Sequence, residues 1–194
     1  PYFTKYSPNQ NEDNTHKIRR IESIQVEDLL ERPAIDINTN NVKSILKNKV
    51  VLVSGGAGSI GSEIVRQIAT FKPKAIILME IAESPLHDLT VDLRQQYPYL
   101  QFIPIIADVR DVQMVEKVFE EYHPNVVFHA AAYKHVPLME DFPTQAIMAN
   151  VLGTKNMADM AVKYHAERFV MISTDKAVNP TNVMGASKRI AEIY

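Results

Sequence analysis

The chain contains no cysteine and no tryptophan, and it has only 6 glycines in 194 residues. Without cysteine it forms no disulfide and performs no thiolate chemistry, which fits a reducing compartment. No apolar run approaches the roughly 20 residues that cross a bilayer, and no signal peptide is visible. The 21 basic and 23 acidic residues nearly cancel, so no excess of positive charge favours a nucleic acid or an anionic membrane.

Hydrophobic residues make up 46% of the chain, which is typical of a soluble domain that buries a sizeable core. The length fits one domain. Because the sequence opens on Pro1 and stops at Tyr194 inside a helical pattern, we expect it to be a piece of a longer protein.

The first part of the chain differs from the rest. We interpret residues 1–48 as a linker or N-terminal arm, in which 26–32 has the pattern of a short helix. Val42, Ile45 and Leu46 then fall at helical spacing, and we expect them to pack on the edge of the domain.

From residue 49 to residue 194, apolar runs alternate with amphipathic segments. The expected strands are 50–53, 75–79, 101–107, 125–129 and 168–173. The expected helices are 62–69, 85–97, 112–122, 145–165 and 184–194. Such alternation predicts βαβ units with right-handed crossovers. The expected fold is therefore α/β, a doubly wound parallel sheet of the Rossmann dinucleotide-binding type.

A glycine-rich turn follows the first predicted strand. Its glycines fit two overlapping patterns, Gly56-x-Gly58-x-x-Gly61 and Gly55-x-x-Gly58-x-x-Gly61, and the second is the spacing of short-chain dehydrogenase/reductase relatives. Bare backbone N–H groups and the positive end of a helix suit a pyrophosphate. The turn is therefore a predicted dinucleotide site, formed by Gly55, Gly58, Ser59, Ile60 and Gly61. We also expect one face of the following helix to pack on the sheet, through Ile60, Ile64, Val65 and Ile68.

Acidic residues end the second and third predicted strands. Glu80 stands nineteen residues after Gly61, where a carboxylate accepts hydrogen bonds from the adenosine ribose and repels a 2′-phosphate. This favours NAD over NADP as the cofactor. The alternative is that Glu80 binds no cofactor and is only a solvated residue at the end of the strand. Asp108 and Val109 fall at the expected adenine edge, where Asp108 either accepts the exocyclic amine or caps the helix that starts near Asp111.

Small residues follow the fourth predicted strand. Ala130, Ala131 and Ala132 leave room for a flat cofactor over the sheet edge. The preceding His129 fits a hydrogen-bonded structural residue better than a base. Asn150, in the predicted long helix, either bridges to the catalytic loop or is a plain polar helix position.

The fifth predicted strand leads into Ser173, Thr174, Asp175 and Lys176. Ligands of open α/β sheets bind beyond the carboxyl ends of strands, so this hydroxyl, carboxylate and amine are candidates for catalysis. A solvated loop also holds such residues.

Met184 and Lys188 are four positions apart and share a helix face. In most short-chain dehydrogenase/reductase relatives a tyrosine stands where Met184 is, and the lysine lowers the pKa of its phenol. A thioether carries no proton. Either the site is inactive or proton transfer passes to Asp175 and Lys176.

Three long motifs resemble the CapD-type polysaccharide biosynthesis proteins, which are nucleotide-sugar 4,6-dehydratases of the extended short-chain dehydrogenase/reductase superfamily. The resemblance covers 49–194 together with 26–32. The motifs are GGAGSIGSE at 55–63, HAAAYKHVP at 129–137 and STDKAVNPTNVMGASK at 173–188. A methionine in the tyrosine position is itself a feature of the large membrane-anchored branch of that family.

The resemblance implies conversion of UDP-N-acetylglucosamine to a 4-keto-6-deoxy sugar nucleotide, with NAD reduced and reoxidised in each turnover, for capsule or surface polysaccharide. It implies that Asp175 and Lys176 carry the elimination, in an order left open, and that Thr174 hydrogen-bonds the sugar oxygen at C4. Lys188 would hold the nicotinamide ribose. The implied substrate contacts are Lys134, His135, Asn150 and Asn182. No metal is implied.

Family members extend beyond both ends of this sequence. A substrate region after Tyr194, and membrane helices and another nucleotide-binding domain before Pro1, are expected from the resemblance and are missing. We therefore expect the cytoplasmic domain of a bacterial inner-membrane protein, forming a homo-oligomer of undefined size, with little turnover in this piece alone. The alternatives are a sugar-nucleotide 4-epimerase or reductase, and a catalytically silent NAD-binding regulatory module.

Overall fold

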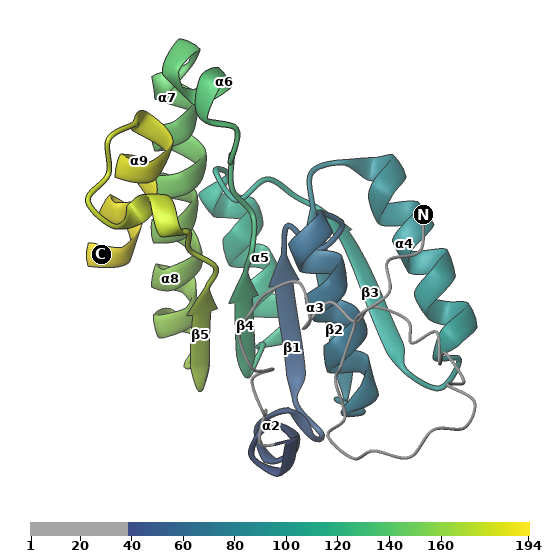
Figure 1. The fold of residues 1–194 in the computed structure, drawn as a ribbon. Coiled ribbons are helices and arrows are strands. Elements are labelled where there is room, and N and C mark those ends of the chain that lie inside the picture. Colours follow the sequence, from purple (N-terminus) through teal and green to yellow (C-terminus); the bar gives the residue numbers. More distant parts are fainter. Residues whose placement is uncertain (1–38) are drawn as a thin grey trace, which may run out of the picture. The chain divides into compact units, whose positions relative to one another are not determined.

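The computed structural model describes residues 39–194, and the helix predicted at 26–32 lies outside the described residues. In the described part, five parallel strands form one sheet (Figure 1). The strands are β1 (Val50–Ser54), β2 (Ala75–Glu80), β3 (Gln101–Ile106), β4 (Val126–His129) and β5 (Arg168–Met171).

Helices precede, connect and follow the strands. They are α2 (Thr39–Leu46), α3 (Ser59–Thr70), α4 (Glu83–Gln96), α5 (Val112–Tyr122), α6 (Val136–Asp141), α7 (Pro143–Ala146), α8 (Gly153–Lys163) and α9 (Val183–Ile193). A π-helix, η1 (Ile147–Leu152), joins α7 to α8, and a 3₁₀ turn, η2 (Asp175–Ala177), precedes α9.

The strand order is β3-β2-β1-β4-β5, so the chain winds outward from β1 in one direction and then from β4 in the other. This reversal places a switch point between β1 and β4, where open α/β sheets bind ligands. The predicted doubly wound parallel sheet is confirmed.

Alternating side chains of the central strands face two separate cores. Val51 and Val53 pack with apolar residues of α3 and α4, whereas Leu52 packs with those of α5 and α8. All three are 0% exposed. Helices therefore cover both faces of the sheet (Figure 1), which explains why β1 is an unbroken apolar run.

The α2 helix packs on the first of these cores. Leu46 is 2% exposed, and Val42 and Ile45 are partly buried against the same cluster. The packing predicted from their spacing is confirmed.

Ile60 is a correction. Val65 and Ile68 are buried as predicted, but Ile60 is 53% exposed. It lies in the first turn of α3, which begins at Ser59, whereas the buried residues Val65 and Ile68 lie further along the helix.

The helix predicted at 145–165 is interrupted. It consists of α7, the π-helix η1 and α8 in succession. The Thr154 hydroxyl donates a hydrogen bond of 2.7 Å to the Asn150 carbonyl within this stretch. Apolar periodicity does not separate a π-turn from an α-turn, so the sequence pattern could not predict the change.

The turn between β1 and α3 brings two stretches of backbone into close contact. Gly55 has φ of 65°, which glycine adopts without strain. A Cβ on Gly61 would lie 2.0 Å from the Gly55 carbonyl oxygen. Only a residue without a side chain fits there.

Gly61→Ala is therefore expected to lower the free energy of unfolding by about 3 kcal/mol or more, because backbone must move to admit the methyl group. Gly58→Ala is the matched control, since its nearest contact of 3.3 Å needs little adjustment. Urea unfolding of both variants measures the difference. Equal stability of the two variants would contradict this description of the turn.

Candidate functional site

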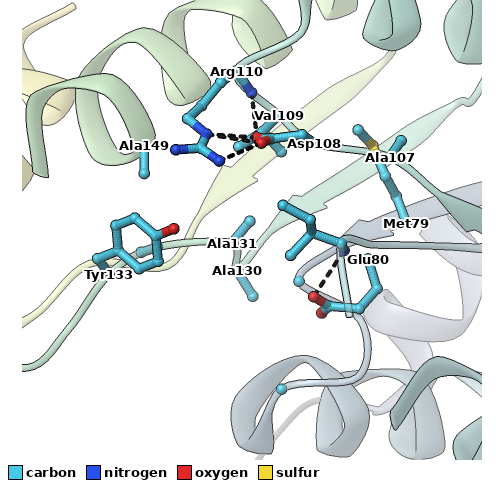
Figure 2. A pocket seen from close by; sticks show the side chains of 14 residues that line it. Met79, Glu80, Ala107, Asp108, Val109, Arg110, Ala130, Ala131, Tyr133 and Ala149 are labelled. Atoms are coloured by element: carbon cyan, nitrogen blue, oxygen red, sulfur yellow. Dashed lines mark hydrogen bonds and ion pairs between the residues drawn. The ribbon is translucent and has the colours of Figure 1, made fainter. Parts of the chain in front are cut away.

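A pocket lies at the carboxyl edge of the sheet, where β1, β2, β3 and β4 end (Figure 2). Half of its lining residues are glycine or alanine. It is lined by Gly55, Gly58, Met79, Glu80, Ile81, Ala107, Asp108, Val109, Arg110, Ala130, Ala131, Ala132, Tyr133 and Ala149. Eight of the predicted cofactor residues are in this wall, namely Gly55, Gly58, Glu80, Asp108, Val109, Ala130, Ala131 and Ala132.

The N-terminus of α3 opens beside this pocket. Its N-cap is Gly58, and no side chain caps the first turn. The backbone N–H groups there remain available to an anion, and the helix dipole adds partial positive charge. This is the arrangement that a pyrophosphate requires.

Glu80 is held in position by backbone groups. Its Oε1 accepts hydrogen bonds from the N–H groups of Ile81 and Ala82, at 2.9 and 3.2 Å, and its Oε2 accepts one from Ala57 at 3.3 Å. The carboxylate is therefore fixed at the wall of the pocket.

Asp108 is paired with Arg110. Arg110 donates from its backbone N–H and from its side chain, with Nη2 at 2.6 Å from Oδ2 of Asp108. These hydrogen bonds hold the pKa of the Asp108 carboxyl below its usual value. The alternative that Asp108 caps the next helix is wrong, because Asp111 is the N-cap of α5 and accepts from Gln113 and Met114.

A second pocket continues from the first. The two share Ala130, Ala132 and Tyr133, so one groove runs from the glycine turn toward Lys188. The second pocket is lined by Ile60, Ala130, Ala132, Tyr133, Lys134, Ile172, Ser173, Thr174, Lys176, Met184 and Lys188. The structure therefore brings together Thr174, Lys176, Met184 and Lys188, as the sequence predicted.

Asp175 stands apart from this wall. It does not line the second pocket, and its side chain is 84% exposed. Its Oδ1 accepts from the Thr174 hydroxyl at 2.9 Å and lies 3.2 Å from Nζ of Lys176. Hydrogen bonds from Thr174 and Lys176 lower the pKa of Asp175.

Lys188 is a buried cation at the end of the groove. It is 4% exposed, and no hydrogen-bond acceptor for its ammonium is found among residues 39–194. Burial lowers the pKa of Lys188, while the nearby charge of Glu192 opposes that shift. The ammonium is thus available to an acceptor on a ligand.

Met184 faces the same pocket and is 3% exposed, packed with Met139 and Ala146. Gly185 brings α9 against the loop before it, since a Cβ there would lie 2.2 Å from the Lys176 carbonyl oxygen. This close approach joins the η2 loop to the helix that carries Lys188.

Asn150 forms a bridge between Tyr133 and Ser187, and not to the loop at 173–176. Its Oδ1 accepts from the Tyr133 N–H at 2.8 Å, and its Nδ2 donates to the Tyr133 carbonyl and to Ser187 Oγ, at 3.0 and 2.9 Å. It is 0% exposed, so the predicted direct contact of Asn150 with substrate is corrected to a positioning role.

The other predicted substrate contacts lie in different places. Lys134 lines the second pocket, and its ammonium donates to Ser59 Oγ at 3.4 Å, close to the glycine turn. Asn182 caps α9 by accepting from the Gly185 N–H at 2.7 Å, and His135 is the exposed N-cap of α6. Neither Asn182 nor His135 lines the groove.

His129 is a buried structural residue, as predicted, with 0% exposure. Thr154 donates its proton to the Asn150 carbonyl, so the bond of 2.9 Å between Thr154 Oγ1 and His129 Nε2 needs a proton on Nε2. His129 Nδ1 then accepts from Ser54 Oγ at 2.6 Å. Burial and the charge of Lys188 lower the pKa of His129 to about 3.

Sequence reasoning missed Arg110, Met79, Tyr133 and Ala149 in the groove. Arg110 directly follows Asp108 and Val109, the two predicted adenine contacts. Its position in the sequence could therefore have identified it as a residue of the same pocket. Among residues 39–194, no three or more His, Asp or Glu side chains are grouped to hold a metal, and none of the helices there has the length and apolarity to span a membrane.

The sheet order, the glycine turn and the connected groove define a Rossmann-type domain of the short-chain dehydrogenase/reductase kind. The chain belongs to the polysaccharide biosynthesis protein family, whose profile matches residues 51–194. Proteins named UDP-glucose 4-epimerase are among its relatives, such as that of Rickettsia canadensis, which is 37% identical over 154 residues.

One curated relative is the capsular polysaccharide biosynthesis protein CapD of Staphylococcus aureus. It is 47% identical over 178 residues, which cover 91% of this chain and 30% of CapD. The chain thus spans less than a third of the length of that relative.

Two solved structures share the fold. Pen from Bacillus thuringiensis is 32% identical, with a TM-score of 0.72 over 77% of this chain and 46% of Pen. WbmG of Bordetella bronchiseptica, solved in complex with NAD, is 22% identical, with a TM-score of 0.64 over 76% of this chain and 49% of WbmG.

The buried neutral His129 predicts a stability loss in mild acid. Its folded pKa of about 3 lies below the ordinary 6.5, so the unfolded chain binds the extra proton as the pH falls below 6.5. The free energy of unfolding should therefore fall, with a slope approaching about 1.4 kcal/mol per pH unit. Urea unfolding between pH 6.5 and about 5 measures it.

His129→Gln is the control, because glutamine keeps one donor and one acceptor but does not titrate. In this variant the free energy of unfolding should depend less steeply on pH, by the contribution of one proton, whatever its absolute stability. Identical slopes in both proteins would show that His129 is not held neutral.

Proposed function

We propose that this chain is the NAD-binding catalytic domain of a sugar-nucleotide 4,6-dehydratase in polysaccharide biosynthesis. The proposed substrate is UDP-N-acetylglucosamine, and the product is its 4-keto-6-deoxy derivative. The observation that carries the proposal is the single groove that joins the glycine turn to Thr174, Lys176 and Lys188.

The groove fits a dinucleotide. The uncapped N-terminus of α3 suits the pyrophosphate, and the fixed Glu80 carboxylate suits ribose hydroxyls. Asp108 lies where the adenine amine would find an acceptor, and Lys188 offers its ammonium at the nicotinamide end. The same Glu80 carboxylate supports NAD over NADP, because a 2′-phosphate would meet a negative charge.

The bound NAD would supply the hydride acceptor for sugar C4 and the hydride donor for C6. Thr174 is proposed to hydrogen-bond the oxygen at C4, since this residue lines the second pocket. Lys188 is proposed to hold the nicotinamide ribose and to stabilise negative charge near the C4 oxygen. Met184 contributes an apolar wall at the position of the usual tyrosine and takes no part in proton transfer.

Asp175 and Lys176 are proposed to carry the elimination. The C4 ketone acidifies the proton at C5, one group of the pair removes that proton, and the other protonates the C6 hydroxyl as it leaves as water. Their contact of 3.2 Å allows proton exchange between them after each turnover. Which group is acid and which is base stays open.

A 4-epimerase or reductase is the alternative that the relatives keep open. Redox chemistry at C4 alone includes no elimination of water and needs no acid for a leaving hydroxyl. It would therefore leave the Asp175–Lys176 pair without a catalytic role. A catalytically silent NAD-binding module is the third possibility, suggested by Met184. The products of the reaction distinguish all three.

We further propose that activity belongs to a longer protein that contains this chain, as the coverage of CapD suggests. The added residues would supply the sugar-nucleotide pocket, a membrane anchor that leaves this domain in the cytoplasm, and contacts for a homo-oligomer. In that protein the N-terminal residues 1–48 would act as a linker.

In the longer protein, Lys176→Ala and Asp175→Asn should each reduce turnover by at least about a hundredfold, because each removes one proton-transfer group. Met184→Leu should retain most activity, since the replacement is of similar shape. Mass spectrometry after incubation with UDP-N-acetylglucosamine detects a product lighter by one water. An active Lys176→Ala enzyme would remove Lys176 from the elimination.

The unaltered chain should bind NADH at least about tenfold more tightly than NADPH, a difference of about 1.4 kcal/mol. Glu80→Gln should narrow that ratio, because the repelling charge is lost while the shape is kept. Glu83→Gln is the matched control, because Glu83 lies in the first turn of α4 and does not line the groove. Fluorescence titration measures both affinities, and a preference for NADPH would refute the assignment of Glu80.

A further inference from the structure

Arg110 connects two parts of the chain at the wall of the adenine pocket. It follows β3, and its Nε lies 3.0 and 2.8 Å from the two carboxylate oxygens of Asp108. Its Nη1 donates to Oε1 of Gln145, on α7, at 2.9 Å. One guanidinium therefore ties the β3 side of the pocket to the helix that leads into η1.

The guanidinium is placed between the two walls of the pocket. Figure 2 shows it extending from Asp108 toward the side where Tyr133 and Ala149 lie. Arg110, Tyr133 and Ala149 all line the pocket, and the side chain of Arg110 is only 28% exposed. A planar, permanently charged group there can also lie against the face of a flat base.

We propose that Arg110, tied to Asp108 and Gln145, is a strap that retains the adenosine half of the bound dinucleotide. For the adenosine to leave on that side, the bond between Arg110 and Gln145 has to break. The strap rests on the proposed function, because an enzyme that takes a hydride from its substrate and returns it gains nothing by releasing the cofactor.

Gln145 is the cleanest position for a test. It does not line the pocket, so its substitution leaves the direct contacts of the ligand unchanged. Removing Arg110 itself would leave the Asp108 carboxylate unpaired and would confuse the two effects. Thr144 lies next to Gln145 on α7, and its side chain forms no hydrogen bond within residues 39–194, which makes Thr144→Ala the matched control.

The experiment measures the release rate of NADH from this chain by its fluorescence, after displacement with excess ADP-ribose. Gln145→Ala should accelerate release by about three- to tenfold, the effect of losing one partly exposed hydrogen bond to a charged group. Gln145→Glu, which adds an ion pair, should slow release by about two- to fivefold. Thr144→Ala should release NADH at the unaltered rate.

Reduced nicotinamide mononucleotide, which lacks adenosine, should leave all four proteins at the same rate. Equal NADH release rates in the unaltered protein, Gln145→Ala and Gln145→Glu would overturn the strap while leaving the proposed function intact. Failure of the unaltered protein to bind NADH would overturn the strap and the cofactor part of the proposed function together.

Discussion

The close contact of backbone with backbone at the start of α3 is the constraint on which the site depends. The Gly55 carbonyl lies where a side chain on Gly61 would have to be, so β1 can turn directly into α3. That turn places the uncapped helix N-terminus beside the pocket at the switch point of the sheet. A wider turn would move the positive end of the helix away from any phosphate, since the dipole acts only over the first turn.

Sequence patterns predicted the fold because the features that determine each helix and strand lie within that segment of the sequence. The apolar run of β1 and the spacing of Val42, Ile45 and Leu46 each indicate which element forms and which face is buried. The π-helix and the exposure of Ile60 were not predictable in this way. The apolar periodicity of a segment does not distinguish a π-turn from an α-turn, and it does not show which positions of an apolar face remain exposed.

For the same reason, some parts of the site were predicted from the sequence and others were not. Backbone features, such as the glycine turn and the strand ends, follow from the sequence order alone. The roles of side chains that bond to partners far along the chain could not be predicted from the sequence order. Asn150 fills its hydrogen bonds with Tyr133 and Ser187, seventeen and thirty-seven positions away, and Arg110 reaches Gln145 across thirty-five. Such pairs become visible only when the fold brings them together.

Buried and solvent-exposed side chains lie close together at and beside the second pocket, and this difference in exposure bears on which groups are ready for proton transfer. Lys188 and Met184 are 4% and 3% exposed, whereas the side chains of Asp175 and Lys176 are 84% and 49% exposed. A solvated carboxylate with a lowered pKa is a weak base. Seating a sugar nucleotide over the pair would remove water, raise the pKa of Asp175 and strengthen it as a base. Proton transfer at this site would then depend on the presence of the substrate itself, whereas Lys188, the proposed contact of the nicotinamide ribose, is already buried in the free protein.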